Sequence, residues 1–262
     1  MKKNLLKLVP ALLLSLLAGA VGLAGCRPRA PEHGISFLAE VDTNRVSARL
    51  LPGRGVEATV EVLRKRVDVP GVAKPLIQPV GDNRILIRLP GLTEAEKASA
   101  KSQIQKAGFL EFRLVHPESD ALLKQGTVQP GCEVKVERRK RQGTVVEVRR
   151  LVKKEPERGL TGDYVAESWV TLDPISGEPK ISLKFNSEGA RLFGDITREH
   201  VGHCLAIILD GELYSAPVIR EPILGGTCEI SGSFDLAEAH DLAAALQHPL
   251  PAPIRILEER KF

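Results

Sequence analysis

The chain has 262 residues, a net charge of +4 from 37 Lys and Arg against 33 Asp and Glu, and a hydrophobic fraction of 43%. This composition excludes an intrinsically disordered protein, which combines low hydrophobicity with high net charge. The length allows one large domain or two modest ones. The slight positive charge does not by itself indicate a nucleic-acid partner.

The start of the chain has the pattern of an export signal. Three lysines within the first seven residues precede the uncharged run Val9–Ala24, as in a secretory signal. The run ends in "LAGC", which resembles the bacterial lipobox, so residues 1–25 are predicted to be a signal peptide cut before Cys26. The resemblance implies a diacylglycerol on the Cys26 thiol, and two acyl chains hold a protein stably at a bilayer. The alternative is a signal-anchor helix that is never cut.

The rest of the chain is expected to hang from this anchor. Residues 26–33, which contain "RPRAPEH", form a short tether, and no later apolar run approaches the length that a membrane span needs. The mature protein is therefore expected on the periplasmic side of the cell envelope. Whether the anchor sits in the cytoplasmic or the outer membrane stays open, although Arg27 after Cys26 is typical of outer-membrane sorting in many Gram-negative bacteria.

The first part of the body alternates strands and helices. Residues 35–41 alternate apolar and polar side chains as a strand does, and apolar residues at 56, 60, 63 and 67 lie on one helix face. Strands over 74–80 and 84–90 flank the turn Gly81–Asn83. Thr93 and Glu96 have the spacing of a capping box that opens a second helix, and residues 110–114 alternate as a fourth strand. The order βαββαβ predicts a ferredoxin-like α+β unit.

A basic segment follows over 116–159. Charged and β-branched residues alternate on both sides of Gln142–Gly143, which predicts a long two-stranded ribbon. Arg138–Arg141 could serve as a patch for nucleic acid or anionic lipid. A charged hairpin that resists edge-to-edge pairing is the favoured interpretation. Because an exported protein rarely meets nucleic acid, no nucleic-acid partner is expected, and lipid headgroups remain the rival.

Residues 160–249 form a second α+β unit. A strand over 181–185 precedes a helix that starts near Ser187, and a helix capped by Asp235 ends before Pro249. Between them lies "LAIILDGELYSAP", in which Asp210 and Gly211 separate two strand-like runs. Asp-Gly is a strong signal for a type I′ hairpin turn, since both positions need a positive φ. The sequence therefore predicts a structural hairpin turn at Asp210 and Gly211.

No catalytic or metal site is expected. The sequence has no nucleophile elbow, zinc-protease motif or phosphate-binding loop, and Asp210 lacks a visible acid–base partner. His200, His203 and Cys204, with Cys228 as a fourth ligand, do not match the usual paired spacings of zinc sites. We expect no enzyme activity, no metal and no cofactor. A hydrolytic activity that depended on Asp210 or His200 would revive the enzyme hypothesis.

Cleavage before Cys26 leaves three cysteines besides the acylated one. Cys132, Cys204 and Cys228 permit one disulfide and one free thiol. Cys204 and Cys228 are the more plausible pair, because both lie at strand-like positions in one region. The sequence does not give their Cα separation, so the pairing stays open.

Several segments together resemble a known family. "GISFLAEVD", "VEVLRKRVDVPGVAKPLIQPVGDNRILIRLPG" and "AGFLEFRLV" resemble the first periplasmic (P1) domain of SecD, the accessory subunit of the bacterial protein-export translocase. The segment from Pro179 to Arg260 follows the family pattern more closely, with "FNSEGARLF", "LAIILDGELYSAP" and "ISGSFDLAEAHDLA" in order. The resemblance covers about residues 34–260.

The resemblance implies a ferredoxin-like base, a head inserted in it and a role in export. It implies a base from residues 34–115 plus 250–262, a head from 160–249, and the basic hairpin 116–159 between them. The implied partners are unfolded preprotein and membrane subunits of the Sec translocase. Because the chain stops at Phe262, where the family continues with further membrane helices, it is not expected to couple proton flow by itself.

Two functions follow as hypotheses. The first is a lipid-anchored, non-enzymatic export accessory that binds translocating or newly exported unfolded polypeptide. The alternative is an envelope lipoprotein that keeps the fold as a structural or recruitment module without an export role.

Overall fold

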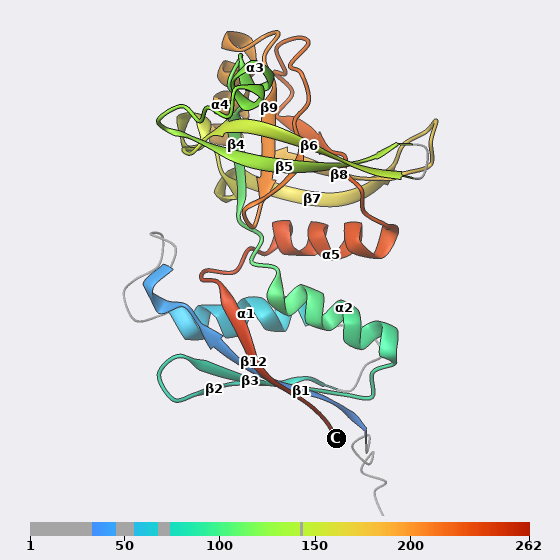
Figure 1. Cartoon of the computed structure of the whole chain (residues 1–262). Coiled ribbons are helices and arrows are strands. Elements are labelled where there is room, and N and C mark those ends of the chain that lie inside the picture. Colours follow the sequence, from blue (N-terminus) through green and yellow to red (C-terminus); the bar gives the residue numbers. More distant parts are fainter. Residues whose placement is uncertain (1–32, 46–54, 68–73, 142–143) are drawn as a thin grey trace, which may run out of the picture. The chain divides into compact units, whose positions relative to one another are not determined.

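The computed structural model describes residues 33–45, 55–67, 74–141 and 144–262, and all statements of structure concern these ranges. The predicted signal peptide, the proposed lipid site Cys26 and almost all of the predicted tether lie outside them. The described part is a mixed α+β protein with two bodies of secondary structure, which we call the base and the head (Figure 1).

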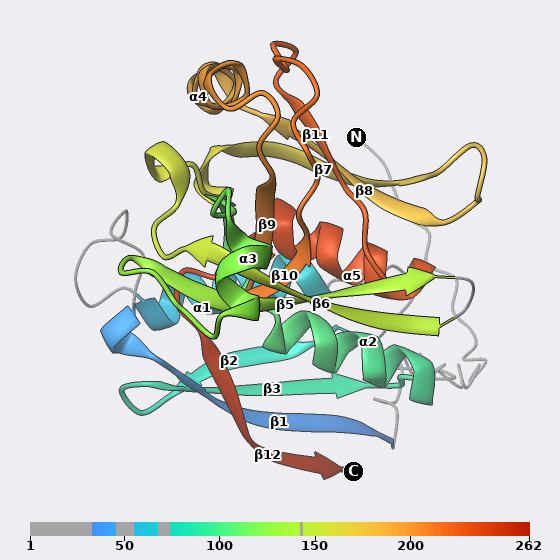
Figure 2. The ribbon, with the colours of Figure 1, turned by 45° about the horizontal axis from the view of Figure 1, so that its top comes forward.

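The base is one four-stranded antiparallel sheet with two helices on one face. The strand order is β12-β1-β3-β2, the order of a ferredoxin-like sheet, and Figure 2 shows the four strands side by side. Alternate residues of the strands face the helices and form one buried cluster with them. The elements of the base are β1 (Gly34–Val41), α1 (Gly55–Val67), β2 (Leu76–Val80), β3 (Arg84–Pro90), α2 (Glu94–Gln105) and β12 (Ile254–Lys261).

Local signals account for the helices of the base. The apolar stripe of α1, which includes Val60 and Leu63, is buried against the sheet. Thr93 caps α2 by accepting the Glu96 N–H, and the Glu96 carboxylate accepts the Thr93 N–H, so the predicted capping box is present. In the part of the chain that is described, no helix is long and apolar enough to cross a bilayer.

The fourth strand of the base is not the one that the local βαββαβ pattern predicted, whereas the family resemblance placed residues 250–262 in the base. Residues 110–114 form β4 (Leu110–Leu114), but this strand pairs with β9 (Leu205–Leu209) in the head, and β12 takes the place beside β1. Alternation specified a buried face for Leu110, Phe112 and Leu114 without specifying which core would cover it. Their side chains pack in the core of the head.

The head contains a five-stranded sheet of order β4-β9-β10-β5-β6 and a three-stranded sheet of order β11-β8-β7. The main cluster of the head lies between these sheets and the helices α4 and α5, and three phenylalanines meet at its centre. The elements of the head besides β4 are α3 (Ser119–Lys124), β5 (Cys132–Arg141), β6 (Thr144–Lys153), β7 (Val165–Leu172), β8 (Pro179–Phe185), α4 (Ser187–Glu199), β9 (Leu205–Leu209), β10 (Glu212–Ser215), β11 (Thr227–Ile230) and α5 (Leu236–Gln247).

The basic ribbon is part of the head rather than a separate insertion between base and head. β5 and β6 pair along their whole length, and β5 also pairs in parallel with β10. A bridge from Val152 of β6 to Val115, just beyond β4, brings the two edges of the five-stranded sheet together. A small apolar cluster that includes Ala206 and Ile208 lies inside the resulting curve. The alternation of charged and β-branched residues predicted the ribbon, but no sequence pattern indicated that β5 pairs in parallel with β10.

The Asp-Gly turn joins β9 to β10, and both residues have positive φ, 51° for Asp210 and 84° for Gly211. No atom lies within 4 Å of the position that a Cβ on Gly211 would take. Any penalty for a side chain at residue 211 therefore comes from the backbone conformation and not from a clash.

We predict that Gly211→Val lowers the free energy of unfolding by about 1–2 kcal/mol, because a β-branched residue is strained at this φ. Gly211→Asn is the matched control and should lose clearly less, since Asn tolerates the left-handed region. Urea unfolding followed by circular dichroism measures both values. If Gly211→Val were as stable as the wild type, the positive φ at residue 211 would not cause the strain that we assign to it.

Candidate functional site at the junction of base and head

The chain passes between base and head twice, and the two passages are hydrogen-bonded to each other. The first runs from the end of α2 through Lys106–Phe109 into β4, and the second from the end of α5 through Pro249–Pro253 into β12. The Leu250 N–H donates to the carbonyl of Ala107 at 2.7 Å. The relation of the head to the base therefore depends on a few residues around these passages.

Arg66 is the central residue of the junction. It lies in the last turn of α1 and is only 5% exposed. Its guanidinium donates to the carbonyls of Gln103 near the end of α2, of Lys106 and Ala107 in the first passage, and of Ala245 and His248 near the end of α5. One side chain of the base thus satisfies carbonyls at two helix ends, where no intrahelical donor is available.

The charge of Arg66 is retained in spite of its burial. Burial lowers the pKa of Arg66 to about 10, and the nearby Asp210 carboxylate partly offsets this effect. The guanidinium is therefore protonated at neutral pH. Its charge strengthens the hydrogen bonds to the five carbonyls.

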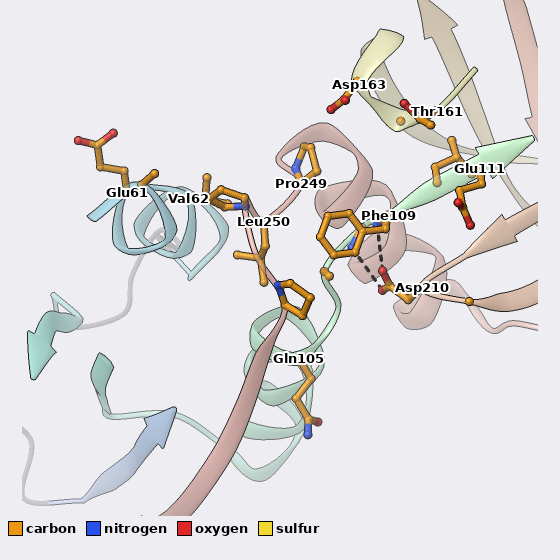
Figure 3. Close-up of a pocket in the computed structure, with 18 of the residues that line it drawn as sticks. Glu61, Val62, Gln105, Phe109, Glu111, Thr161, Asp163, Asp210, Pro249 and Leu250 are labelled. Carbon is orange, nitrogen blue, oxygen red and sulfur yellow. Dashed lines mark hydrogen bonds between the residues drawn. The ribbon is translucent and has the colours of Figure 1, made fainter. Parts of the chain in front are cut away.

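Asp210 fastens the β9–β10 turn to the first passage. Its carboxylate accepts the N–H groups of Phe109 at 2.8 Å and Gly108 at 3.3 Å, and its own N–H donates to the Phe109 carbonyl at 2.9 Å (Figure 3). Both carboxylate oxygens are thus engaged by the backbone. This arrangement suits a structural role and leaves the carboxylate without an acid–base partner among the described contacts.

Gly108 allows the first passage to run close to α5. A Cβ on Gly108 would lie 2.3 Å from the Ala245 carbonyl oxygen, and the residue has a φ of 82°. Helices α2 and α5 are also joined directly. Asp241 of α5 accepts hydrogen bonds from Ser99 at 2.7 Å and Gln103 at 3.2 Å, both on α2. The last helix of the head is therefore held directly on a helix of the base.

A cavity of about 880 Å³ opens beside the junction. Val62 of α1 and Leu250 of the second passage line it with Phe109, and Figure 3 shows Glu61 on the base side and Asp163 on the head side of the same space. Its lining combines apolar residues with the acidic Glu61, Glu111, Asp163 and Asp210 and with Gln105, Arg113 and Thr161.

The other candidate residues are dispersed. The His200 and His203 rings stack edge-to-face at 5.8 Å, and His200 Nε2 lies 3.6 Å from a Glu157 oxygen. Burial raises the pKa of the Cys228 thiol to about 12. Among the residues that the structure describes, no group of three or more His, Cys, Asp or Glu side chains could hold a metal ion.

The three cysteines and the basic patch also have defined surroundings. Cys132, Cys204 and Cys228 are free thiols, so the pairing of Cys204 with Cys228 is not present in this structure.

Two residues of the basic patch Arg138–Arg141 make ion pairs within the ribbon, Arg138 with Glu147 and Arg139 with Glu137. The side chains of Lys140 and Arg141 lie outside the description.

Comparison with known proteins shows the family. A family model described as "SecDF, P1 head subdomain" matches residues 135–252, and one described as "Protein translocase subunit SecDF, P1 domain, N-terminal" matches residues 56–117. A solved structure titled "Structure and function of a membrane component SecDF that enhances protein export" is 31% identical, with a TM-score of 0.62 over 86% of this chain and 99% of that one. The chain belongs to the SecD family and corresponds to its P1 domain.

Full-length SecD proteins share the match over part of their length. The SecD of Calditerrivibrio nitroreducens is 40% identical over 84% of this chain and 43% of its own length, and the SecDF of Thermus thermophilus is 36% identical over 78% and 28%. The chain thus spans about half or less of the length of the curated relatives that it matches, from 28% to 51% among those compared. A crystal structure of SecDF in a super-membrane-facing form covers 91% of this chain with a TM-score of 0.65 and 30% identity.

Sequence reasoning missed Arg66, Gly108 and Asp241. A signal for Arg66 was present, because it lies three residues after Leu63 and one before Val67, next to the apolar stripe of α1. The acceptors of Arg66 are backbone carbonyls up to 182 residues away, and no sequence pattern marks them.

We predict that Arg66→Ala lowers the free energy of unfolding by at least about 3 kcal/mol, because several carbonyls at the junction lose their donor together. Lys65→Ala is the matched control, since Lys65 is the exposed neighbour on the same helix, and it should change stability by less than about 0.5 kcal/mol. Urea unfolding of the two variants tests this. A loss for Arg66→Ala as small as that for Lys65→Ala would show that the five hydrogen bonds contribute little.

Proposed function

We propose that this chain is a non-enzymatic accessory of protein export that binds unfolded polypeptide on the periplasmic side of the cytoplasmic membrane. The observation that carries the proposal is the match to SecD across both base and head, including a solved domain of which this chain covers 99%. That solved structure is described as a membrane component SecDF that enhances protein export.

The geometry supports binding rather than catalysis. Asp210 at the junction has both carboxylate oxygens engaged by backbone N–H groups, and the walls of the cavity beside it offer both apolar and charged residues. Binding of unfolded chains needs apolar contact and backbone hydrogen bonding and no reactive side chain. We therefore assign no cofactor, no metal and no nucleic-acid partner, and we propose membrane subunits of the Sec translocase as partners.

We also propose that the chain is held at the membrane by a lipid on Cys26. The lipobox-like "LAGC" after an apolar run supports this proposal. Two or three acyl chains at this position would keep the base and head near a bilayer. Anchoring at the cytoplasmic membrane fits the export role, whereas the outer membrane would favour the structural or recruitment module.

The binding proposal predicts that the full chain in detergent captures a permanently unfolded protein, such as reduced and carboxymethylated lactalbumin. The same lactalbumin in its native, disulfide-bonded form is the matched control and should not bind, because its backbone and apolar groups are already paired. Fluorescence anisotropy of the labelled proteins measures both. Equal affinity for the two forms, or no binding of either, would contradict the proposed function.

The anchoring proposal predicts that the mature protein begins at Cys26 and carries the mass of a diacylglycerol and an additional acyl chain. Cys26→Ser should abolish both the modification and the cleavage before residue 26. Mass spectrometry of the amino terminus tests this, and fractionation of the membranes then shows which one holds the protein. An unmodified amino terminus that starts at Met1 would overturn the proposal.

A further inference from the structure

β7 is an edge strand of the three-stranded sheet, and one side of it faces away from β8. The register pairs Glu167 through Leu172 with β8 without interruption. The Ser168 N–H points away from this ladder and donates to Gln247 Oε1 at 2.7 Å, while Gln247 Nε2 donates to the Ala166 carbonyl at 3.2 Å. The side-chain amide of Gln247 thus makes the two hydrogen bonds that a residue of an adjacent strand would make.

Beyond Ser168, further backbone N–H and C=O groups of β7 point away from β8. In an antiparallel ladder, alternate residues point their N–H and C=O groups to opposite sides, so Val170 and Leu172 face outward as Ser168 does. The Asp173 N–H donates to the Glu178 carbonyl at 2.8 Å, which places Asp173 on the inward side and confirms the alternation. No other described strand pairs with β7 on its outward side.

The turn after β7 holds this end of the edge in place. The Asp173 carboxylate accepts the N–H groups of Ile175 and Ser176 and pairs with Lys180 at 2.7 Å. These interactions, with the Lys180 pair the largest, hold the pKa of Asp173 well below its usual range. The edge from Ser168 to Leu172 therefore ends in a turn with fixed hydrogen bonding.

Helix α5 packs against β7, but the sequence of Ser168–Leu172 lacks the residues that usually protect an edge. It contains no proline and no charged residue, and the irregularity in the β7–β8 register lies before it, between Val165 and Glu167. The edges of the base differ, because β2 contains Pro79 and the second half of β12 is almost entirely charged. Trp169 is 41% exposed and Leu172 59% exposed along this edge.

We propose that the outward edge of β7 at Ser168–Leu172 accepts an extended segment of unfolded polypeptide as an added strand, and that Gln247 is a displaceable cover over the start of this edge. The proposal rests on the proposed function, since it names where and how the unfolded chain binds. Backbone groups spaced as in a strand recognise any extended chain, and Trp169 and Leu172 offer apolar contact to its side chains.

A second copy of the chain is a weaker candidate for the occupant. Pairing of two such edges would involve about five residues from each copy, whereas stable interfaces use roughly 20–30 residues a side. An unfolded segment needs only a transient contact along the backbone. Displacement of Gln247 would extend the available edge from Val170 and Leu172 back to Ala166, so the bound strand could lengthen after first contact.

The test uses the full chain in detergent and two edge variants with opposite expected effects. Leu172→Pro removes one outward N–H, and Leu172→Ala is its control because it shortens the same side chain and keeps the N–H. Gln247→Ala removes the cover. The probe is a labelled decapeptide of alternating threonine and valine with lysine at each end, and its analogue N-methylated at alternate residues is the control on the ligand side.

One backbone hydrogen bond changes a binding constant by about two- to tenfold. Leu172→Pro should therefore bind the decapeptide about two- to tenfold more weakly than Leu172→Ala, and Gln247→Ala should bind it about two- to tenfold more tightly than the wild type. The N-methylated analogue should bind poorly to all forms. Because the chain has a single tryptophan, the fluorescence of Trp169 should change on binding, and thermal melts show whether each variant is folded.

The outcomes separate this proposal from the proposed function. Capture of carboxymethylated lactalbumin that is unchanged in Leu172→Pro and Gln247→Ala would overturn the β7 site and leave the function intact. Failure of the wild type to capture lactalbumin at all would overturn both. A third outcome is that the chain dimerises at high protein concentration, that Leu172→Pro abolishes the dimer, and that no peptide binds. This outcome would assign the edge to a second copy of the chain and contradict the proposal.

Discussion

One buried guanidinium holds the two bodies of this protein together. Arg66 lies on a helix of the base, and its five carbonyl acceptors lie at the end of α2, on the first passage and at the end of α5. An apolar residue could fill the same space but could not satisfy these carbonyls. The hydrogen bonds of Asp241 with Ser99 and Gln103 hold α5 on α2 as well. Asp210 adds a second fastening from the head side, and its charge helps to keep Arg66 protonated.

Local sequence signals predicted local structure well. The capping boxes at Thr93 and Asp235 are present as the spacing indicated, and the helix expected near Ser187 begins there with Asn186 as its cap. The strands of the base were predicted from alternation. The pairing of β2 with β3 was predicted from the turn at Gly81–Asn83, but alternation alone did not identify the second neighbour of β1, because it determines which residues share a face and leaves the neighbouring strand open. β4 and β12 exchanged roles for this reason, and the parallel pairing of β5 with β10 had no sequence signal.

The candidate site was predictable only in part. Asp-Gly indicated a turn, but the engagement of Asp210 with Gly108 and Phe109 joins residues about a hundred positions apart. Arg66 was passed over because charged residues on a helix are normally solvated. β7 was not predicted, since Ala166 and Glu167 interrupt its alternation and an irregularity shifts its register at the same place. That strand carries the edge on which the binding proposal depends.

The proposed binding edge on β7 lies next to the junction that Arg66 stabilises. Gln247, the last residue of α5, touches the β7 edge, and Arg66 binds the carbonyls of Ala245 and His248 on either side of it. The end of α5 is thus held from the base while its last side chain covers an edge of the head.

The central claim is that Arg66 makes base and head one cooperative unit. Native-state hydrogen exchange measures this directly, through the opening free energies of core amides at Phe37 in the base and Phe112 in the head. The account predicts that the two amides open with the same free energy in the wild type and with clearly different ones in Arg66→Ala. Different opening free energies in the wild type, or identical ones after Arg66→Ala, would contradict it.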